Sequence, residues 1–302
     1  MTVELSIKFA RVSRLLARGG WKRVDLQFDE AQREFEIAWN KIYEEYGDKP
    51  QEAVAASKKL IALQPLATAL VLAMARSDSV EVFGRFKRFL ESVLVKTERL
   101  SGYPAVRSIP HVQGGFLYMT ASVMALRWES WGIFEKLLNS KLEWYYQSGR
   151  AIFSYPFDVP YFFHSEAFGR EATKIHDFFR QELAEPEVVK ITQLTGDSIT
   201  DAYIQTQMLM CLKVAQLYEK GESVRIWPDF GRFFGHRVVR LFDRLYGDPE
   251  FGSGLLRAFG EDKQTFFSHL NVRLKFIYTT FFKGGQYSYE SLDSWEPRET
   301  HA

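Results

Sequence analysis

Residues 123–138 indicate how this chain folds, and they read Val123-Met-Ala-Leu-Arg-Trp-Glu-Ser-Trp-Gly-Ile-Phe-Glu-Lys-Leu-Leu. The stretch begins with small and apolar residues, turns sharply between Trp128 and Trp131, and continues with a second apolar pattern. On both sides of the turn, apolar residues recur every three or four positions, which is the spacing of a helix with one buried face. The stretch therefore predicts two consecutive helices that pack against each other as an antiparallel hairpin.

The same periodicity continues along most of the chain. No segment shows the strict two-residue alternation of a half-buried strand. Glycine and proline separate the periodic segments, as in Gly47-Asp48-Lys49-Pro50, where glycine suits the end of a helix and proline lies just beyond it. The predicted fold is all-α, with no sheet of three or more strands. The expected helices cover residues 2–18, 25–46, 51–76, 79–97, 113–127, 129–147, 161–183, 186–195, 198–220, 230–246, 249–259 and 262–282.

The expected helical hairpins follow one another at intervals of roughly 35–50 residues, which is the range of helical repeat arrays. We expect a multi-helix array of antiparallel helical hairpins, either α-solenoid-like or a two-lobed helical bundle. The hairpins do not repeat the same residues at fixed positions, so the resemblance to such arrays is architectural and indicates no family. The expected divisions are an N-terminal helical lobe over 1–150, a C-terminal helical lobe over 151–284 and a flexible polar tail over 285–302.

Composition limits the classes of function. Aromatic residues make up 16% of the chain, and each large ring buries roughly 150–250 Å², so wide aromatic helix faces are expected. Lys and Arg number 39 against 38 Asp and Glu, so no overall field attracts nucleic acid or anionic lipid, and any such binding needs a local patch. The single cysteine, Cys211, lies in an apolar run and favours a reducing compartment, most simply the cytoplasm.

Several kinds of site are not indicated by the sequence. The longest apolar run, 63–75, is interrupted by Gln64, Pro65 and Thr68, so no segment reaches the roughly 18 apolar residues of a membrane span. No group of His, Asp and Glu has metal-ligand spacing on one helix. We therefore expect no integral membrane segment, no metal and no cofactor.

A row of basic residues is the strongest candidate for a binding surface. Four members lie four residues apart and share one helical face, and a fifth lies beside them. These residues are Arg232, His236, Arg240, Arg244 and, beside the row, Arg237. Such a row attracts phosphate, nucleic acid or an acidic protein segment. The alternative is that these arginines form ion pairs with acids of the same chain, for instance Glu219, Glu222 or Asp229.

The helix expected over residues 2–18 has a basic face of its own. Lys8, Arg11, Arg14 and Arg18 recur at helical spacing on a face distinct from the apolar one. This face suits an anionic membrane surface or the groove of a partner protein. The alternative is a docked helix whose basic face is simply solvated.

Arg170 and His176 form a pattern that points to catalysis. An arginine followed by a histidine four to six residues later resembles the core motif of HEPN-type helical ribonucleases. The resemblance implies that Arg170 polarises a phosphate group and that His176 assists proton transfer. A helical ribonuclease is therefore one alternative function for this chain.

A second alternative rests on the aromatic segment 155–168. Its prolines prevent a continuous helix, and Asp158, His164 and Glu166 lie among its rings. Such a segment suits an enzyme or carrier with an aromatic-lined helical cavity for a hydrophobic ligand. The architecture favours a helical recognition, scaffold or sensor protein over either alternative. Its partner is then another protein or, through the local basic face, nucleic acid.

Overall fold

The computed structural model of the protein describes residues 2–98, 103–143, 150–154, 174–222, 224 and 236–281. These residues are helical almost throughout. The sheet that they contain has two strands, β1 (Lys141–Leu142) and β2 (Arg150–Ala151), which pair antiparallel with Lys141 opposite Ala151. The all-α fold predicted from the helical periodicity is confirmed. The expected tail at 285–302 lies outside the described residues.

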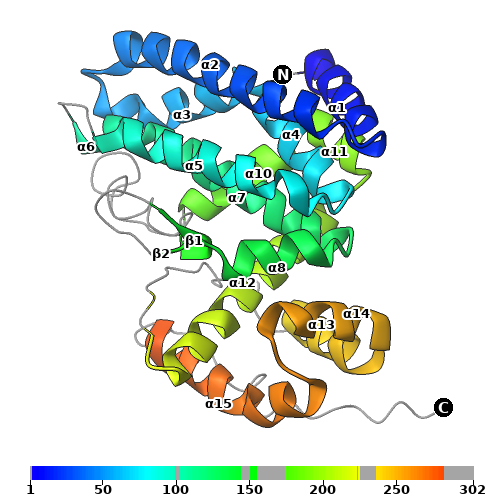
Figure 1. The fold of residues 1–302 in the computed structure, drawn as a ribbon. Helices are drawn as coiled ribbons and strands as arrows, with labels where there is room; N and C mark the ends of the chain where they lie inside the picture. Colours follow the sequence, from blue (N-terminus) through cyan, green and yellow to red (C-terminus); the bar gives the residue numbers. More distant parts are fainter. Residues whose placement is uncertain are drawn as a thin grey trace.

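The helices follow one another in the order shown in Figure 1. Three single turns of 3₁₀ helix are η1 (Pro50–Glu52), η2 (Val80–Val82) and η3 (Ile152–Ser154). The α-helices are α1 (Thr2–Ala17), α2 (Trp21–Tyr46), α3 (Ala53–Ala62), α4 (Pro65–Arg76), α5 (Phe83–Glu98), α6 (Pro104–Arg107), α7 (Ile109–Arg127), α8 (Trp131–Asn139), α10 (Lys174–Leu183), α11 (Pro186–Thr192), α12 (Gly196–Glu219), α13 (His236–Gly247), α14 (Pro249–Phe259) and α15 (Lys263–Phe281).

Helix α7 lies at the centre of the fold. Every residue from Ile109 to Leu126 is buried, because the helix packs against α3, α4, α5, α8 and α12. A helix that is surrounded in this way has no polar face, and α7 is accordingly built mainly from apolar, aromatic and small residues, with His111 and Gln113 buried in its first turns. Figure 1 shows α1 to α5 on one side of α7 and α12 to α15 on the other.

Helices α8 and α14 join the two ends of the structure. Gly254 of α14 makes room for Trp131 of α8, since a Cβ atom on this glycine would lie 2.2 Å from the indole Nε1. The same indole packs edge to face on Phe251, with ring centroids 5.1 Å apart.

Buried apolar residues form one cluster that runs from Leu5 to Ile277. This core crosses residue 150, and the division into lobes over 1–150 and 151–284 remains a prediction, as does the solenoid-like arrangement.

Two predicted helices differ most from the observed ones, while those expected to begin at residues 25 and 113 begin four residues earlier, at Trp21 and Ile109. The segment 51–76 contains two helical pieces that meet at an angle of 66°, because Pro65 lacks an N–H donor and begins α4. The helix expected over 129–147 ends at Asn139, where Ser140 adopts extended backbone geometry and leads into β1.

The described helices were also compared with the length and composition of a membrane span. None of them is long and apolar enough by itself to cross a bilayer. The bent pair Pro50–Ala62 and Pro65–Arg76 meets these two criteria only when its halves are combined. Every residue of α4 from Pro65 to Ala75 is buried in the protein core.

Candidate functional site

Helix α13 carries most of the predicted basic row. Val238, Leu241, Phe242 and Leu245 are buried, as the helical periodicity predicts. The side chains of Arg240 and Arg244 are 57% and 42% exposed, whereas that of Arg237 is only 15% exposed. The first member of the row, Arg232, and the side chain of His236 lie outside the described part of the chain. The described row is thus formed by two exterior arginines and one that is largely covered.

Acids from other elements contact these arginines. Asp201 of α12 forms ion pairs with both Arg237 and Arg240, the latter at 2.8 Å. Arg244 pairs with Glu129, which lies in the turn between α7 and α8, and at 3.5 Å with Asp248.

The acids expected from the sequence have other partners. Glu219 binds Arg273, and Glu222 lies 3.5 Å from Lys141. The third acid, Asp229, lies outside the described residues. Internal ion pairs therefore do form, but with acids that sequence proximity did not indicate.

The exposed arginines surround a cleft of about 220 Å³ between α12, α13, α14 and the end of α7. Its apolar lining consists of Ala202, Leu241 and Phe251, which are all buried. Polar and charged groups complete the wall: Arg127, Ser198, Asp201, Gln205, Arg240 and Arg244. We call this cavity the arginine cleft. Its volume suits a carboxylate or phosphate group with the first atoms of the chain that bears it.

Several contacts fix the geometry of the cleft. The guanidinium of Arg244 lies 3.9 Å from the ring centroid of Phe251, so the cation rests on an aromatic face. Asp248 caps α14 by accepting a hydrogen bond from the Phe251 backbone N–H at 3.0 Å. This backbone hydrogen bond, assisted by Arg244, lowers the pKa of Asp248 below its usual value. The carboxylate thus remains charged at neutral pH and holds the start of α14 against α13.

Arg127 is the cation of the cleft that the sequence patterns did not indicate. It occupies the last turn of α7, more than 100 residues before α13, and its side chain is exposed. Among the described residues it forms no ion pair and no side-chain hydrogen bond. The packing of α7 against α12 brings it to the arginine row.

His176 lies in a different environment. Its side chain is fully buried, and Nδ1 is 2.7 Å from the hydroxyl of Tyr203. Its ring packs edge to face on Phe179. A histidine that exchanges protons with RNA must reach the substrate, so this burial fits a polar pair in the core better than a general acid. The proposed partner Arg170 lies outside the described residues, and the ribonuclease pair remains a prediction.

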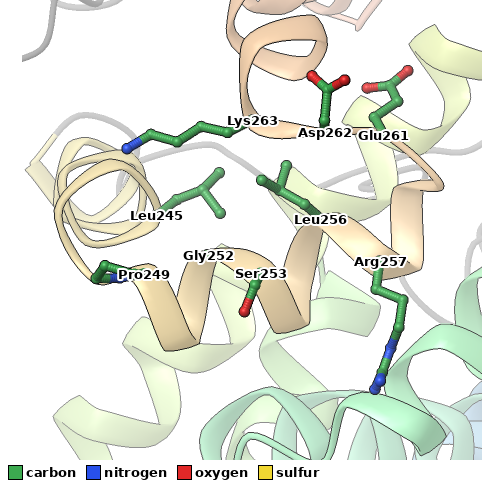
Figure 2. Close-up of a pocket in the computed structure, with 9 residues that line it drawn as sticks. All are labelled: Leu245, Pro249, Gly252, Ser253, Leu256, Arg257, Glu261, Asp262 and Lys263. Carbon is green, nitrogen blue, oxygen red and sulfur yellow. The ribbon is translucent and has the colours of Figure 1, made fainter.

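A second cleft, of about 410 Å³, lies between α13, α14 and the start of α15. Figure 2 shows Leu245 and Leu256 facing each other across it, with Lys263 and Asp262 above. These two charged groups already have partners, because Lys263 donates to the Tyr246 carbonyl and Asp262 accepts from the Thr265 N–H. No aromatic ring lines this cleft, so it does not supply the predicted aromatic cavity. The segment 155–168 lies outside the described residues.

A buried ion network lies beside this second cleft. Arg273 is 1% exposed and binds the carboxylates of Glu219 and Glu261 at 2.7–3.0 Å. Burial raises the pKa of Glu261, but hydrogen bonds from Arg273 and Gln216 outweigh this effect, so the pKa lies below the usual value. The network joins α12 to α15 and has a structural role in the fold.

Comparison of the chain with known protein families, with curated proteins and with solved structures finds no match.

Among the described residues, no three His, Cys, Asp or Glu side chains gather in a way that holds a metal ion. The thiol of Cys211 is buried, and this burial raises its pKa well above the usual value.

Proposed function

We propose that this chain is a helical recognition protein that binds an acidic segment of a protein partner in the arginine cleft. The observation that carries the proposal is the convergence of Arg127, Arg240 and Arg244 on a cleft with an apolar floor. Three cations from two helices provide charge, and the floor provides surface for the carbon atoms of an aspartate or glutamate side chain.

The internal ion pairs support this assignment. Asp201 places a carboxylate of the chain itself on this surface, where its two oxygens each contact one arginine of α13, and this supports a carboxylate as the ligand. Arg127 has no such counter-ion among the described residues and is therefore available to an incoming carboxylate. Planar guanidinium groups bind carboxylates through paired hydrogen bonds, which makes arginine well suited to this kind of recognition.

A short acidic peptide tests the proposal directly. Binding of fluorescently labelled hexaglutamate is measured by fluorescence anisotropy at low and moderate NaCl. An exposed pair contributes up to about 1 kcal/mol, so Arg127→Gln is expected to weaken binding about fivefold. The combination with Arg240→Gln should weaken it further, and the affinity of the unchanged protein should fall as salt rises.

Lys136→Gln is the matched control. Lys136 is an exposed cation of α8 that forms no ion pair among the described residues and does not line the cleft. This variant has the same change in net charge as Arg127→Gln and should bind the peptide normally. Equal weakening by both variants would contradict the proposal. Tighter binding of a labelled single-stranded RNA through Arg127 would assign the cleft to nucleic acid instead.

A further inference from the structure

Helix α1 presents a basic face to the outside of the molecule. Its apolar residues Leu5, Phe9, Val12 and Leu16 are buried, and the helix packs against α4. The opposite face of a helix with this spacing carries the residues at positions 7, 11, 14 and 18. These residues are Ile7, Arg11, Arg14 and Arg18, and all four are exposed. Three of the four cations predicted on the basic face, Arg11, Arg14 and Arg18, therefore point outward beside Ile7, whereas the fourth, Lys8, is 20% exposed and pairs with Glu4 and Glu34.

The turn between α1 and α2 extends this face. Gly19 adopts a left-handed conformation with φ of 64°, which glycine accommodates without strain. A Cβ atom on Gly20 would lie only 3.0 Å from the Leu15 carbonyl oxygen, so this close turn also favours glycine. The two glycines bring the start of α2 beside the end of α1. A cleft of about 470 Å³ opens there, lined by Leu15, Arg18, Gly19, Gly20, Trp21, Lys22 and Arg23.

The cations of this corner lack counter-ions among the described residues. They are Arg11, Arg14, Arg18, Lys22 and Arg23, which we call the basic corner. Within the described part of the chain, none of the five forms an ion pair, although Arg14 donates a hydrogen bond to the Ala10 carbonyl. Neighbouring cations behave differently, since Lys8 pairs with Glu4 and Glu34, and Arg85 pairs with Asp25. The basic corner is thus a local excess of positive charge on a nearly neutral protein.

Exposed apolar side chains lie next to these cations. Ile7 and Leu26 are 62% and 60% exposed, and Trp21 is 37% exposed at the mouth of the turn. Tryptophan beside lysine and arginine is the combination that occurs at the interface between water and a lipid bilayer. An acidic peptide or a nucleic acid requires the cations but gives no reason for the exposed isoleucine and leucine.

We propose that the basic corner docks the protein on an anionic lipid bilayer. In this arrangement the five cations contact head-group phosphates and carboxylates, and Ile7, Trp21 and Leu26 enter the boundary of the acyl chains. Figure 1 shows α1 at the end of the molecule opposite α15. The inference does not depend on the arginine cleft, which is formed by other helices.

Co-sedimentation with vesicles tests the docking. The protein is expected to bind phosphatidylcholine vesicles that contain about 30 mol% phosphatidylserine, and to bind pure phosphatidylcholine vesicles weakly. Each basic residue near an anionic surface contributes about fivefold, so Arg18→Gln with Lys22→Gln and Arg23→Gln should weaken binding about a hundredfold. These side chains are exposed and unpaired among the described residues, so the melting temperature should not change.

A second triple variant is the control for net charge. Lys136→Gln with Lys220→Gln and Lys275→Gln removes three exposed cations from helices that do not pack against α1 and should leave vesicle binding within about twofold. Trp21→Ser keeps every charge and should still weaken binding several-fold through the lost apolar contact. The proposal is overturned if the protein ignores anionic vesicles or if both triple variants lose binding equally. It is also overturned if the basic corner binds single-stranded RNA but no vesicle.

Discussion

Arg240 of α13 and Asp201 of α12 form an ion pair of 2.8 Å in the wall of the arginine cleft. The same carboxylate also pairs with the largely covered Arg237. Asp201 therefore occupies part of the cation surface that an acidic partner would use, while it also joins two helices. Under the proposed function, an acidic partner would compete with Asp201 for Arg240, and this competition would limit its affinity for the cleft.

Replacing this carboxylate should tighten binding and weaken the fold. Asp201→Asn frees Arg240 for the peptide, so the affinity for hexaglutamate should rise about fivefold. The largely covered Arg237 loses its ion pair with Asp201, which should cost about 1–3 kcal/mol of the free energy of unfolding. Anisotropy and urea denaturation measure the two effects. Asp197→Asn, an exposed acid one turn earlier, is the charge-matched control; an equal gain in affinity there would show a general charge effect.

The packing of α8 on α14 yields a second prediction. Gly254→Ala places a methyl group within 2.2 Å of the Trp131 indole, so one of the helices must shift, and we expect a loss of about 1–3 kcal/mol. Gly84→Ala is the control, because nothing lies within 4 Å of its Cβ position and alanine favours the helix. Chemical denaturation should show destabilisation only for Gly254→Ala. Equal stability of the two variants would contradict the packing described here.

The buried ion network should be the most sensitive charged site in the described structure. Arg273→Met leaves the carboxylates of Glu219 and Glu261 without their shared cation, which should cost about 3–5 kcal/mol. Arg257→Met removes an arginine that is 59% exposed and pairs with Glu135, and should cost less than about 1 kcal/mol. Urea denaturation at pH 7 compares the two variants. Similar losses would show that Arg273 is not held as the structure indicates.

The same network makes stability depend on pH. Glu261 has a lowered pKa in the folded protein, so the unfolded chain binds its proton more readily. The stabilisation is therefore complete above the usual value of 4.5 and is lost as pH falls through the folded-state pKa. As pH falls through this acidic range, the free energy of unfolding of the wild-type protein should decrease, and that of Glu261→Gln should decrease less. Parallel pH profiles for the two proteins would exclude this role for Glu261.

The ribonuclease alternative predicts cleavage of single-stranded RNA, and we expect none. His176 is buried against Tyr203, so His176→Ala should act on stability, with a loss of about 2 kcal/mol or more from the cavity and the lost hydrogen bond to Tyr203. A fluorogenic RNA assay and a thermal melt check both expectations. Cleavage that disappears with Arg170→Ala and with His176→Ala, in variants that remain folded, would restore the ribonuclease assignment.

Local sequence patterns predicted which segments form helices better than they predicted where each helix begins and ends. The stripe in α1 and the glycine after α2 depend on residues a few positions apart, and these predictions match the structure. Pro65 was visible in the sequence, yet the segment 51–76 was expected to be one helix because its apolar spacing continues across the proline. The early end of α8 depends on pairing with β2, a contact that local periodicity does not reveal.

The arginine cleft was only partly predictable for the same reason. Arg240 and Arg244 follow from four-residue spacing on one helix, and the burial of Leu241 follows from the same pattern. Arg127 and Asp201 come from α7 and α12, and only tertiary packing brings them to α13. No local pattern distinguishes Arg127 from other exposed arginines, since an acid, Glu129, lies only two residues away in the sequence.

Site-specific crosslinking tests the recognition function most directly. Ser198 lines the arginine cleft, and a photoreactive p-benzoylphenylalanine at this position can capture what occupies it in the native cell. We predict a crosslink to an Asp- or Glu-rich segment of a partner protein. This crosslink should be lost with Arg127→Gln and Arg240→Gln and should be absent when the probe is placed at Lys136. A crosslink to nucleic acid, or the same crosslinks from both positions, would contradict this prediction.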